Sequence, residues 1–396
     1  MATISGGNGT VVTLNAGSSD ANGLATQLAN QISAALKAGT VVQTSGTNPP
    51  TGIGYLATSL VNSTIVLQPA VETLTLSGGG ANTVIGGGGA KQQILADNGN
   101  LTFNTGGGSG TVVTGDGNDL LAAPTSGGGS FTFVTGSGND TIVAASGTNT
   151  ISAGAGNNLI FTSGSSDLIY SNGVDTIVGG TGNGGDTVLG GGLSALIYEG
   201  TKTLNFVGGT GSVTVFAGTG SETVVAGTGG GLIAGGSNGN NVLTGGNGAV
   251  GTTMFGGGAG DILSARGSGS SLLVAGAGNE TLTGAGSTAN NVFYTGSGSA
   301  SITGGSGNDV IFAGTGSSTV DGGPGADLIA IVAGRAGGSV TIAFNAAEDR
   351  VTLQGYGANE LNNAIKAAGS SNTITLSDQT KITFTGITGV NSSYFV

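Results

Sequence analysis

Residues 295–329 read TGSGSASIT-GGSGNDVIF-AGTGSSTVD-GGPGADLI, one pattern repeated every nine residues. Each unit has a glycine-rich half and then a short half with one regularly placed apolar residue: Ile302, Ile311, Val320 and Ile329. Glycine permits a tight turn with positive φ, and the residues after it suit an extended strand. The same spacing recurs upstream, and about 28 units fit between residues 70 and 330. A repeat this short predicts a solenoid, because one unit cannot bury its apolar side chain without neighbours.

Two units make one coil, with a turn on each side, and stacked coils bury a narrow ladder of Ile, Val and Leu. We therefore predict an all-β fold, a parallel β-roll or β-helix solenoid of about 14 coils. The predicted domains are an N-terminal α/β cap or docking segment (residues 1–68), the solenoid (69–333) and a β-rich C-terminal cap (334–396). A flexible Gly/Ser linker is disfavoured, since linkers do not keep an apolar residue in register.

The composition excludes several classes of function. The chain has 396 residues, of which 86 are Gly, and it has no Cys, His or Trp. Disulfides, the usual zinc sites and Ser-His-Asp or Cys-His catalysis are therefore impossible. Nothing in the carboxylate spacing singles out a glycosidase pair, so we expect no enzyme. With 8 basic residues and a net charge of −12, nucleic acids and anionic membrane surfaces are poor partners.

The best units follow the pattern G-G-x-G-x-D-x-(apolar)-x. Gly304–Ile311 and Gly322–Ile329 match at every position, and near matches surround Asp119, Asp140 and Asp186. The pattern resembles the RTX, or haemolysin-type, calcium-binding repeat family. That resemblance implies Ca²⁺ held between stacked coils by Asp carboxylates and turn carbonyls, the oxygen ligands that this ion prefers. It implies metal-site residues Asp309, Asp327, Asp119, Asp140, Asp186, Gly305, Gly307, Gly323 and Gly325.

The acidic position of the motif is often replaced in this chain. It holds Asn149, Asn158, Asn241 and Asn291 in four units and Glu222 and Glu280 in two others. Asp309 and Asp327 lie 18 residues apart, the separation of equivalent positions in successive coils, and form the best pair. We expect a few calcium sites rather than one per repeat. The alternative is that the Asp and Asn side chains only cap turns by accepting hydrogen bonds from backbone amides.

The two ends differ from the repeat. Leu24, Leu28, Ile32 and Leu36 predict a helix that begins after Asp20 and ends at Gly39. Near the C-terminus we predict a helix over 358–368 and strands over 373–376 and 381–384. The final segment resembles the end of type I secretion substrates, which implies one-step export by that machinery from a Gram-negative bacterium. We find no Sec signal pattern and no bilayer-spanning apolar run, so we expect a protein that is secreted or displayed at the cell surface, with no membrane insertion.

The function that we favour is a secreted structural protein. It would self-assemble through solenoid ends and caps into a filament, biofilm-matrix fibre or surface layer, braced in part by calcium, because uncapped strand edges promote end-to-end joining. The main alternative is a monomeric, calcium-dependent adhesin for polysaccharide or another surface. Against it, Tyr170, Tyr198 and Tyr294 stand isolated in the sequence, with no aromatic ladder for stacking sugars. Ice binding is a third alternative, suggested by threonines at 210, 219 and 228.

Overall fold

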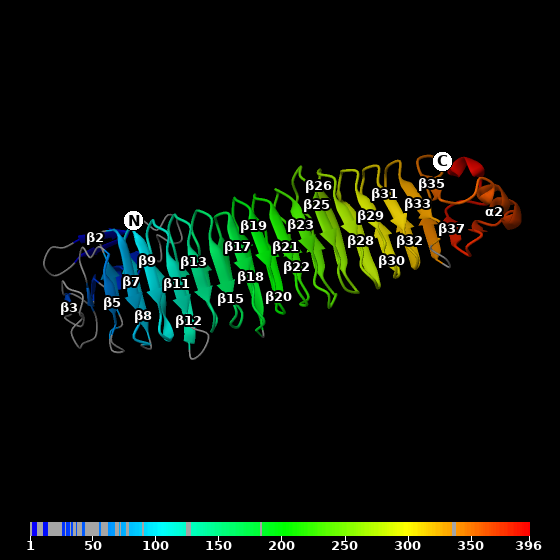
Figure 1. Cartoon of the computed structure of the whole chain (residues 1–396). Helices are drawn as coiled ribbons and strands as arrows, with labels where there is room; N and C mark the ends of the chain where they lie inside the picture. Colours follow the sequence, from blue (N-terminus) through cyan, green and yellow to red (C-terminus); the bar gives the residue numbers. More distant parts are fainter. Residues whose placement is uncertain are drawn as a thin grey trace. The chain divides into compact units, whose positions relative to one another are not determined.

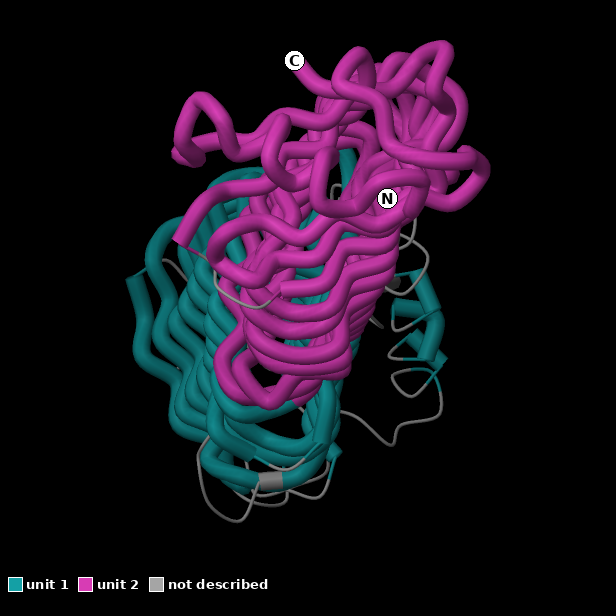
Figure 2. Tube along the Cα trace, turned by 90° about the vertical axis from the view of Figure 1, so that its right-hand side faces the viewer, with its two compact units in different colours: residues 1–202 teal, residues 203–396 magenta. Residues whose placement is uncertain are grey.

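The structure is a computed structural model. It describes residues 91–123, 128–182, 184–334 and 338–396. Before these it describes 2–5, 11–14, 42–43, 55–56, 62–67, 73–76 and 79–88, together with Val71 and some positions between 26 and 37. The described residues form two compact units, residues 1–202 and 203–396 (Figure 2). The chain is an all-β parallel solenoid of about 14 turns, which confirms the predicted fold class.

In the first unit, each coil contributes one strand to each of two parallel sheets, so successive strands alternate between the sheets (Figure 1). We name each sheet after the numbers of most of its strands. The even-numbered sheet contains β4 (Tyr55–Leu56), β6 (Thr73–Leu76), β8 (Gln92–Ala96), β10 (Gly108–Val113), β12 (Gly128–Val134), β14 (Thr150–Ser152), β16 (Leu168–Ser171) and β18 (Gly185–Gly190). It also includes β3 (Val42–Gln43), which pairs with β4. The odd-numbered sheet contains β5 (Thr64–Val66), β7 (Ala81–Ile85), β9 (Asn100–Asn104), β11 (Leu120–Ala123), β13 (Thr141–Ala144), β15 (Leu159–Thr162), β17 (Asp175–Val178) and β19 (Ala195–Tyr198). A separate antiparallel hairpin joins β1 (Ala2–Ser5) to β2 (Val11–Leu14).

The second unit repeats this plan. Its even-numbered sheet contains β20 (Thr203–Val207), β22 (Thr223–Val225), β24 (Val242–Thr244), β26 (Ile262–Gly267), β28 (Glu280–Ser287), β30 (Ala300–Thr303), β32 (Ser317–Asp321) and β34 (Ser339–Ala343). Its odd-numbered sheet contains β21 (Val213–Phe216), β23 (Gly231–Ala234), β25 (Thr252–Phe255), β27 (Leu272–Val274), β29 (Val292–Tyr294), β31 (Val310–Ala313), β33 (Leu328–Val332) and β35 (Arg350–Gln354).

The core of each unit is a ladder of apolar side chains, one from each strand. Ile142 pairs with Ile160 and Ile311 with Ile329, each 18 residues apart, and all four are fully buried. Burial of a side chain of this size contributes roughly 1.5–3 kcal/mol. The regular apolar positions read from the sequence are therefore the core positions of the fold.

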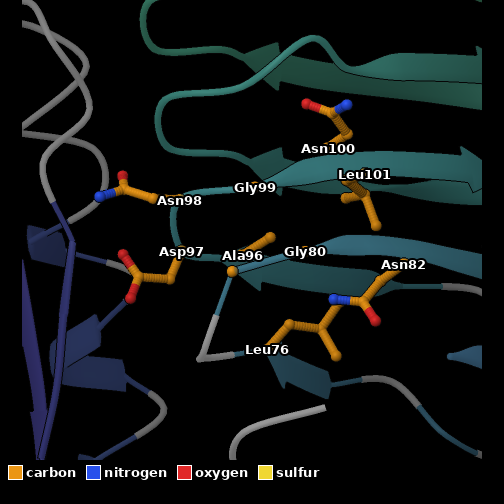
Figure 3. A pocket seen from close by; sticks show the side chains of 10 residues that line it. Leu76, Gly80, Asn82, Ala96, Asp97, Asn98, Gly99, Asn100 and Leu101 are labelled. Carbon is orange, nitrogen blue, oxygen red and sulfur yellow. The ribbon is translucent and has the colours of Figure 1, made fainter. Parts of the chain in front are cut away.

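The turns bring backbone against backbone in successive coils. Gly99, between β8 and β9, has φ +132°, and a Cβ there would lie 2.6 Å from the carbonyl oxygen of Gly80. Figure 3 shows this turn, with Gly99 between Asn98 and Asn100. Its pocket has a volume of about 10 Å³, far below the roughly 300–1,000 Å³ of typical small-molecule sites. Glycine is needed here because a side chain would separate the coils.

The C-terminal elements confirm the predicted helix and strands. Helix α2 (Glu360–Ala368) precedes β36 (Thr373–Thr375) and β37 (Lys381–Thr385), and a short 3₁₀ helix η1 (Ser392–Tyr394) follows. Strand β37 pairs parallel with β34 and antiparallel with β36. The only buried residue of α2 is Ala364, while Leu361, Ile365 and Ala368 are half-buried. These elements extend the even-numbered sheet with strands that do not follow the nine-residue repeat.

At the N-terminal end, the described positions between 26 and 37 are helical. The four predicted apolar positions, Leu24, Leu28, Ile32 and Leu36, lie outside the described residues, as does Asp20. The predicted domain boundaries at 68 and 333 remain predictions.

Candidate metal-binding turns

A column of buried polar side chains lies at the turns that precede the strands. Each occupies the acidic position of the repeat, and its oxygen accepts the backbone N–H of the equivalent residue one coil earlier. In the first unit, Leu101 N–H donates to Asp119 Oδ1 at 2.7 Å and Asp119 N–H donates to Asp140 Oδ1 at 2.9 Å. In the second unit, Asp309 N–H donates to Asp327 Oδ1 at 2.8 Å. One carboxylate oxygen of each thus links two coils.

The acidic residues of the column differ in whether their other carboxylate oxygen has a hydrogen-bond partner. Asp327 Oδ2, Asp261 Oδ2, Glu222 Oε1 and Glu280 Oε1 are buried and have no hydrogen-bond partner, and the same is true of Oδ2 in Asp119 and Asp140. A buried, unpaired carboxylate oxygen is costly, and it is stabilised by a proton or by a cation. These atoms have the chemistry and the position to serve as ligands of a hard cation such as Ca²⁺.

Burial also changes how readily these groups ionise. It raises the pKa of Asp119 to about 6, although the nearby Thr114 hydroxyl and the Leu101 N–H oppose the rise. It raises the pKa of Glu222 to about 7 and that of Asp327 to about 6. The pKa values of Asp140 and Asp309 are raised for the same reason. Each of these carboxyls therefore holds a proton at higher pH than an ordinary carboxyl does, and a bound cation would have to displace that proton.

The predicted pair Asp309 and Asp327 lies in successive coils, but the two carboxylates differ. Asp309 Oδ2 accepts the Gly305 N–H at 2.7 Å and its Oδ1 accepts the Asn291 N–H at 2.6 Å. Both oxygens of Asp309 therefore cap backbone amides, as in the alternative interpretation of these residues. Asp327 keeps Oδ2 unpaired, so it is the member of the pair with an oxygen available to an ion.

The predicted turn glycines lie against one another in neighbouring coils. A Cβ on Gly323 (φ +86°) would lie 2.4 Å from the carbonyl oxygen of Gly305, and one on Gly325 (φ +140°) would lie 2.2 Å from that of Gly307. Glycine carbonyls thus line the same turns as the acidic column. Carbonyl and carboxylate oxygens together form the ligand set that Ca²⁺ takes in proteins.

Asp186, also predicted as a metal ligand, is held differently. Its Oδ1 accepts the Asp167 N–H at 3.0 Å, and its Oδ2 accepts the Thr162 hydroxyl at 2.7 Å. Lys202 is 1% exposed, and its ammonium donates to Asp186 Oδ1 at 2.9 Å and to Oδ2 at 3.1 Å. The ammonium also donates to the Ser165 carbonyl oxygen at 2.9 Å and lies 3.6 Å from Asp167 Oδ2. At this coil the Lys202 ammonium provides the positive charge beside the acidic column that a bound cation would provide elsewhere.

Sequence reasoning missed Lys202, because it lies outside the repeat motif and 16 residues after Asp186. One signal was present: between residues 92 and 330 the basic residues are Lys202 and Arg266 alone. A lysine within a repeat region that has only one other basic residue indicates a specific partner. Among the described residues, no group of three or more acidic side chains gathers into one cluster, so a turn offers at most two carboxylates to one ion.

Stacked parallel coils with acidic residues and glycine carbonyls at their turns define a β-roll. The model of the RTX calcium-binding nonapeptide repeat matches the chain in four copies, at residues 134–169, 205–233, 286–320 and 303–330. The chain therefore carries RTX repeats, and such repeats bind Ca²⁺. The matched segments include Asp140, Asp309 and Asp327 but neither Asp119 nor Asp186. No curated protein and no solved structure matches the chain.

The RTX repeats place the chain among calcium-binding β-roll proteins, and such repeats are typical of secreted proteins. The fold is typically non-catalytic. Within the part of the chain that the structure describes, no helix has the length and apolar character needed to cross a membrane.

Proposed function

We propose that this protein is a secreted, extracellular structural component that assembles with copies of itself into a filament, matrix fibre or surface layer. The observation that supports this is the share of the chain given to the repeat. Coils stack from β4 to β19 in the first unit and from β20 to β35 in the second. The solenoid is thus the main body of the protein rather than an accessory to another domain. Export by type I machinery, with residues 334–396 as the signal, is part of the same proposal.

Calcium acts in this proposal as a brace between coils. Asp327, Glu222, Asp261 and Glu280 would hold it through their unpaired oxygens, together with glycine carbonyls of the turns. When bound, the ion supplies the positive charge that these buried carboxylates lack. Asp309 and Asp186 instead bond within the chain and position the turns. We therefore expect fewer ions than repeats.

The adhesin alternative depends on aromatic rings that could stack on sugars. Tyr294, which stands isolated in the sequence, packs on Phe312 with ring centroids 4.5 Å apart and planes 2° apart. The two rings therefore turn a face toward each other. Sugar rings stack on aromatic faces, so this pair favours packing within the sheet over sugar binding.

Electron microscopy of the purified protein, in millimolar calcium and then in chelator, tests the proposed function. Ordered filaments or sheets in calcium that disappear in chelator support a calcium-braced polymer. Assemblies in both conditions support the structural role and reduce calcium to a local brace. Single particles in both conditions, at every concentration, refute the structural role and favour the adhesin.

A further inference from the structure

The odd-numbered sheet of the second unit has an unusual outer surface. In each strand from β21 to β31, the residues on either side of the buried core residue point outward. One column runs Phe216, Ala234, Phe255, Val274, Tyr294 and Phe312, and each residue is in register with the next. The other runs Thr214, Leu232, Thr253, Leu272, Val292 and Val310. We call these two columns the apolar stripe.

The apolar stripe is partly open to solvent. Phe216 and Phe255 are 38% and 41% exposed, and the other members are half-buried. Its polar groups are the hydroxyls of two threonines and of Tyr294, and it has no charged residue, although the chain carries a net charge of −12. The outer face of the even-numbered sheet is mixed. It exposes Val207, Val242 and Ile262, but it also carries threonine or serine at 223, 281, 301 and 319 and the exposed charged residues Arg266 and Asp321. Contiguous exposed apolar surface of this kind marks an interaction site.

From this surface we infer that the apolar stripe is the contact through which a second copy of this chain packs, sheet against sheet. The inference rests on the proposed self-assembly and names its surface. The stripe carries no charged side chain, so two copies can bring their stripes together without removing a charge from water. The caps and solenoid ends then need not be the main junction.

The spacing of the stripe also fits a second copy. In the first column, large and small residues alternate over four strands, from Phe216 to Ala234, Phe255 and Val274, and two large residues, Tyr294 and Phe312, follow. Parallel strands lie about 4.8 Å apart, so a surface with the same strand spacing can match this alternation over those four strands. A second stripe displaced by one strand places its large side chains over the small ones. Such interdigitation is how sheet faces pack.

Aromatic geometry argues against a sugar as the occupant. The rings of Tyr294 and Phe312 lie face to face at 4.5 Å, so they present edges to the outside. Ring edges pack well between the aliphatic side chains of another sheet.

The size of the stripe predicts weak association. Two positions on each of the six strands make 12 residues, whereas a stable interface takes roughly 20–30 residues a side. One pair of stripes is therefore expected to join reversibly, so that stable assembly needs several contacts at once.

Sedimentation of the full chain in calcium tests the inference, with Phe255→Lys against Ile262→Lys. Ile262 is a matched control, because it is 42% exposed and lies on the outer face of the even-numbered sheet. We expect the wild type and Ile262→Lys to associate as concentration rises, and Phe255→Lys to need at least about tenfold more protein, since a desolvated lysine opposes packing. Leu272→Asn serves as a second, milder variant, and circular dichroism checks that every variant is folded.

The inference is wrong if Phe255→Lys and Leu272→Asn associate like the wild type, or if Ile262→Lys weakens association equally. Filaments that persist in Phe255→Lys would reject the stripe and leave the proposed structural function standing. A wild type that stays monomeric at all concentrations would reject both. A flotation assay with phosphatidylcholine vesicles tests a lipid surface as the other occupant. If the wild type does not self-associate but binds the vesicles, and Phe255→Lys does not bind them, the stripe is a lipid-binding surface and the inference is wrong.

Discussion

Removal of the Lys202 ammonium is expected to destabilise the first unit strongly. The substitution Lys202→Met keeps most of the side-chain length but deletes the charge and three hydrogen bonds, to the Ser165 carbonyl oxygen and to both oxygens of Asp186. Asp186 and Asp167 then remain buried together without a counter-charge. Breaking a buried ion pair in this way costs about 3–5 kcal/mol in the free energy of unfolding.

The pH dependence of this cost follows from the acids left behind. Burial raises the pKa of Asp167, the charge of Asp186 raises it further, and Lys202 lowers it. The substitution removes the positive charge that lowers the pKa of Asp167, so that this pKa is higher in the variant than in the wild type. At pH 8 the variant must keep the Asp167 carboxylate ionised without a counter-charge, whereas at lower pH Asp167 takes up a proton more readily. The loss of stability is therefore expected to be larger at pH 8 than at pH 5.

The assay is urea unfolding followed by circular dichroism, in chelator, at both pH values. Lys381→Met is the matched control, because Lys381 is exposed and its substitution should change stability by no more than about 0.5 kcal/mol. The double variant Asp186→Asn with Lys202→Met should recover part of the loss, since one unpaired charge is removed. A cost below about 1 kcal/mol for Lys202→Met at pH 8 would refute the reasoning, because it would mean that water solvates the acids.

Three further predictions concern the acidic column and the turns. Asp327→Asn keeps an oxygen that can accept the Asp309 N–H but removes the negative charge. Calorimetry should therefore show weaker calcium binding, with little loss of stability in chelator. Unchanged calcium binding would mean that Asp327 only caps its turn. Burial raises the pKa of Glu222 to about 7 and that of Asp327 to about 6. The folded state therefore holds protons that the unfolded state releases, and the melting temperature in chelator should fall as pH rises from about 4 through 7 and level off near pH 8, above the pKa of Glu222. Calcium should raise the melting temperature more at pH 8 than at pH 5, and equal gains would contradict this. Gly314→Ala puts a Cβ 1.6 Å from the Gly296 carbonyl oxygen, whereas Gly357 has nothing within 4 Å; urea unfolding should show a loss of about 1–3 kcal/mol for the first and almost none for Gly357→Ala.

The candidate site was predictable in its location but not in its detail. The motif placed Asp309 and Asp327 at equivalent positions of successive coils, and the structure confirms that arrangement. It could not show that Gly305 occupies the second oxygen of Asp309 while that of Asp327 stays unpaired. That difference depends on the orientation of each carboxylate within its turn, which the nine-residue pattern does not encode.

The nine-residue period alone determined the parallel solenoid of this protein, its inward ladder and its glycine turns. The reason is local: each unit can bury its apolar residue only against a neighbour in the same register, as Ile311 does against Ile329. The tertiary structure alone decided which side chains meet across coils. It brought Lys202 to Asp186, and it aligned residues such as Phe255 and Val274 into one uncharged outer face. Such contacts depend on how far a side chain reaches between coils and on which face its strand presents, and neither follows from the repeat itself.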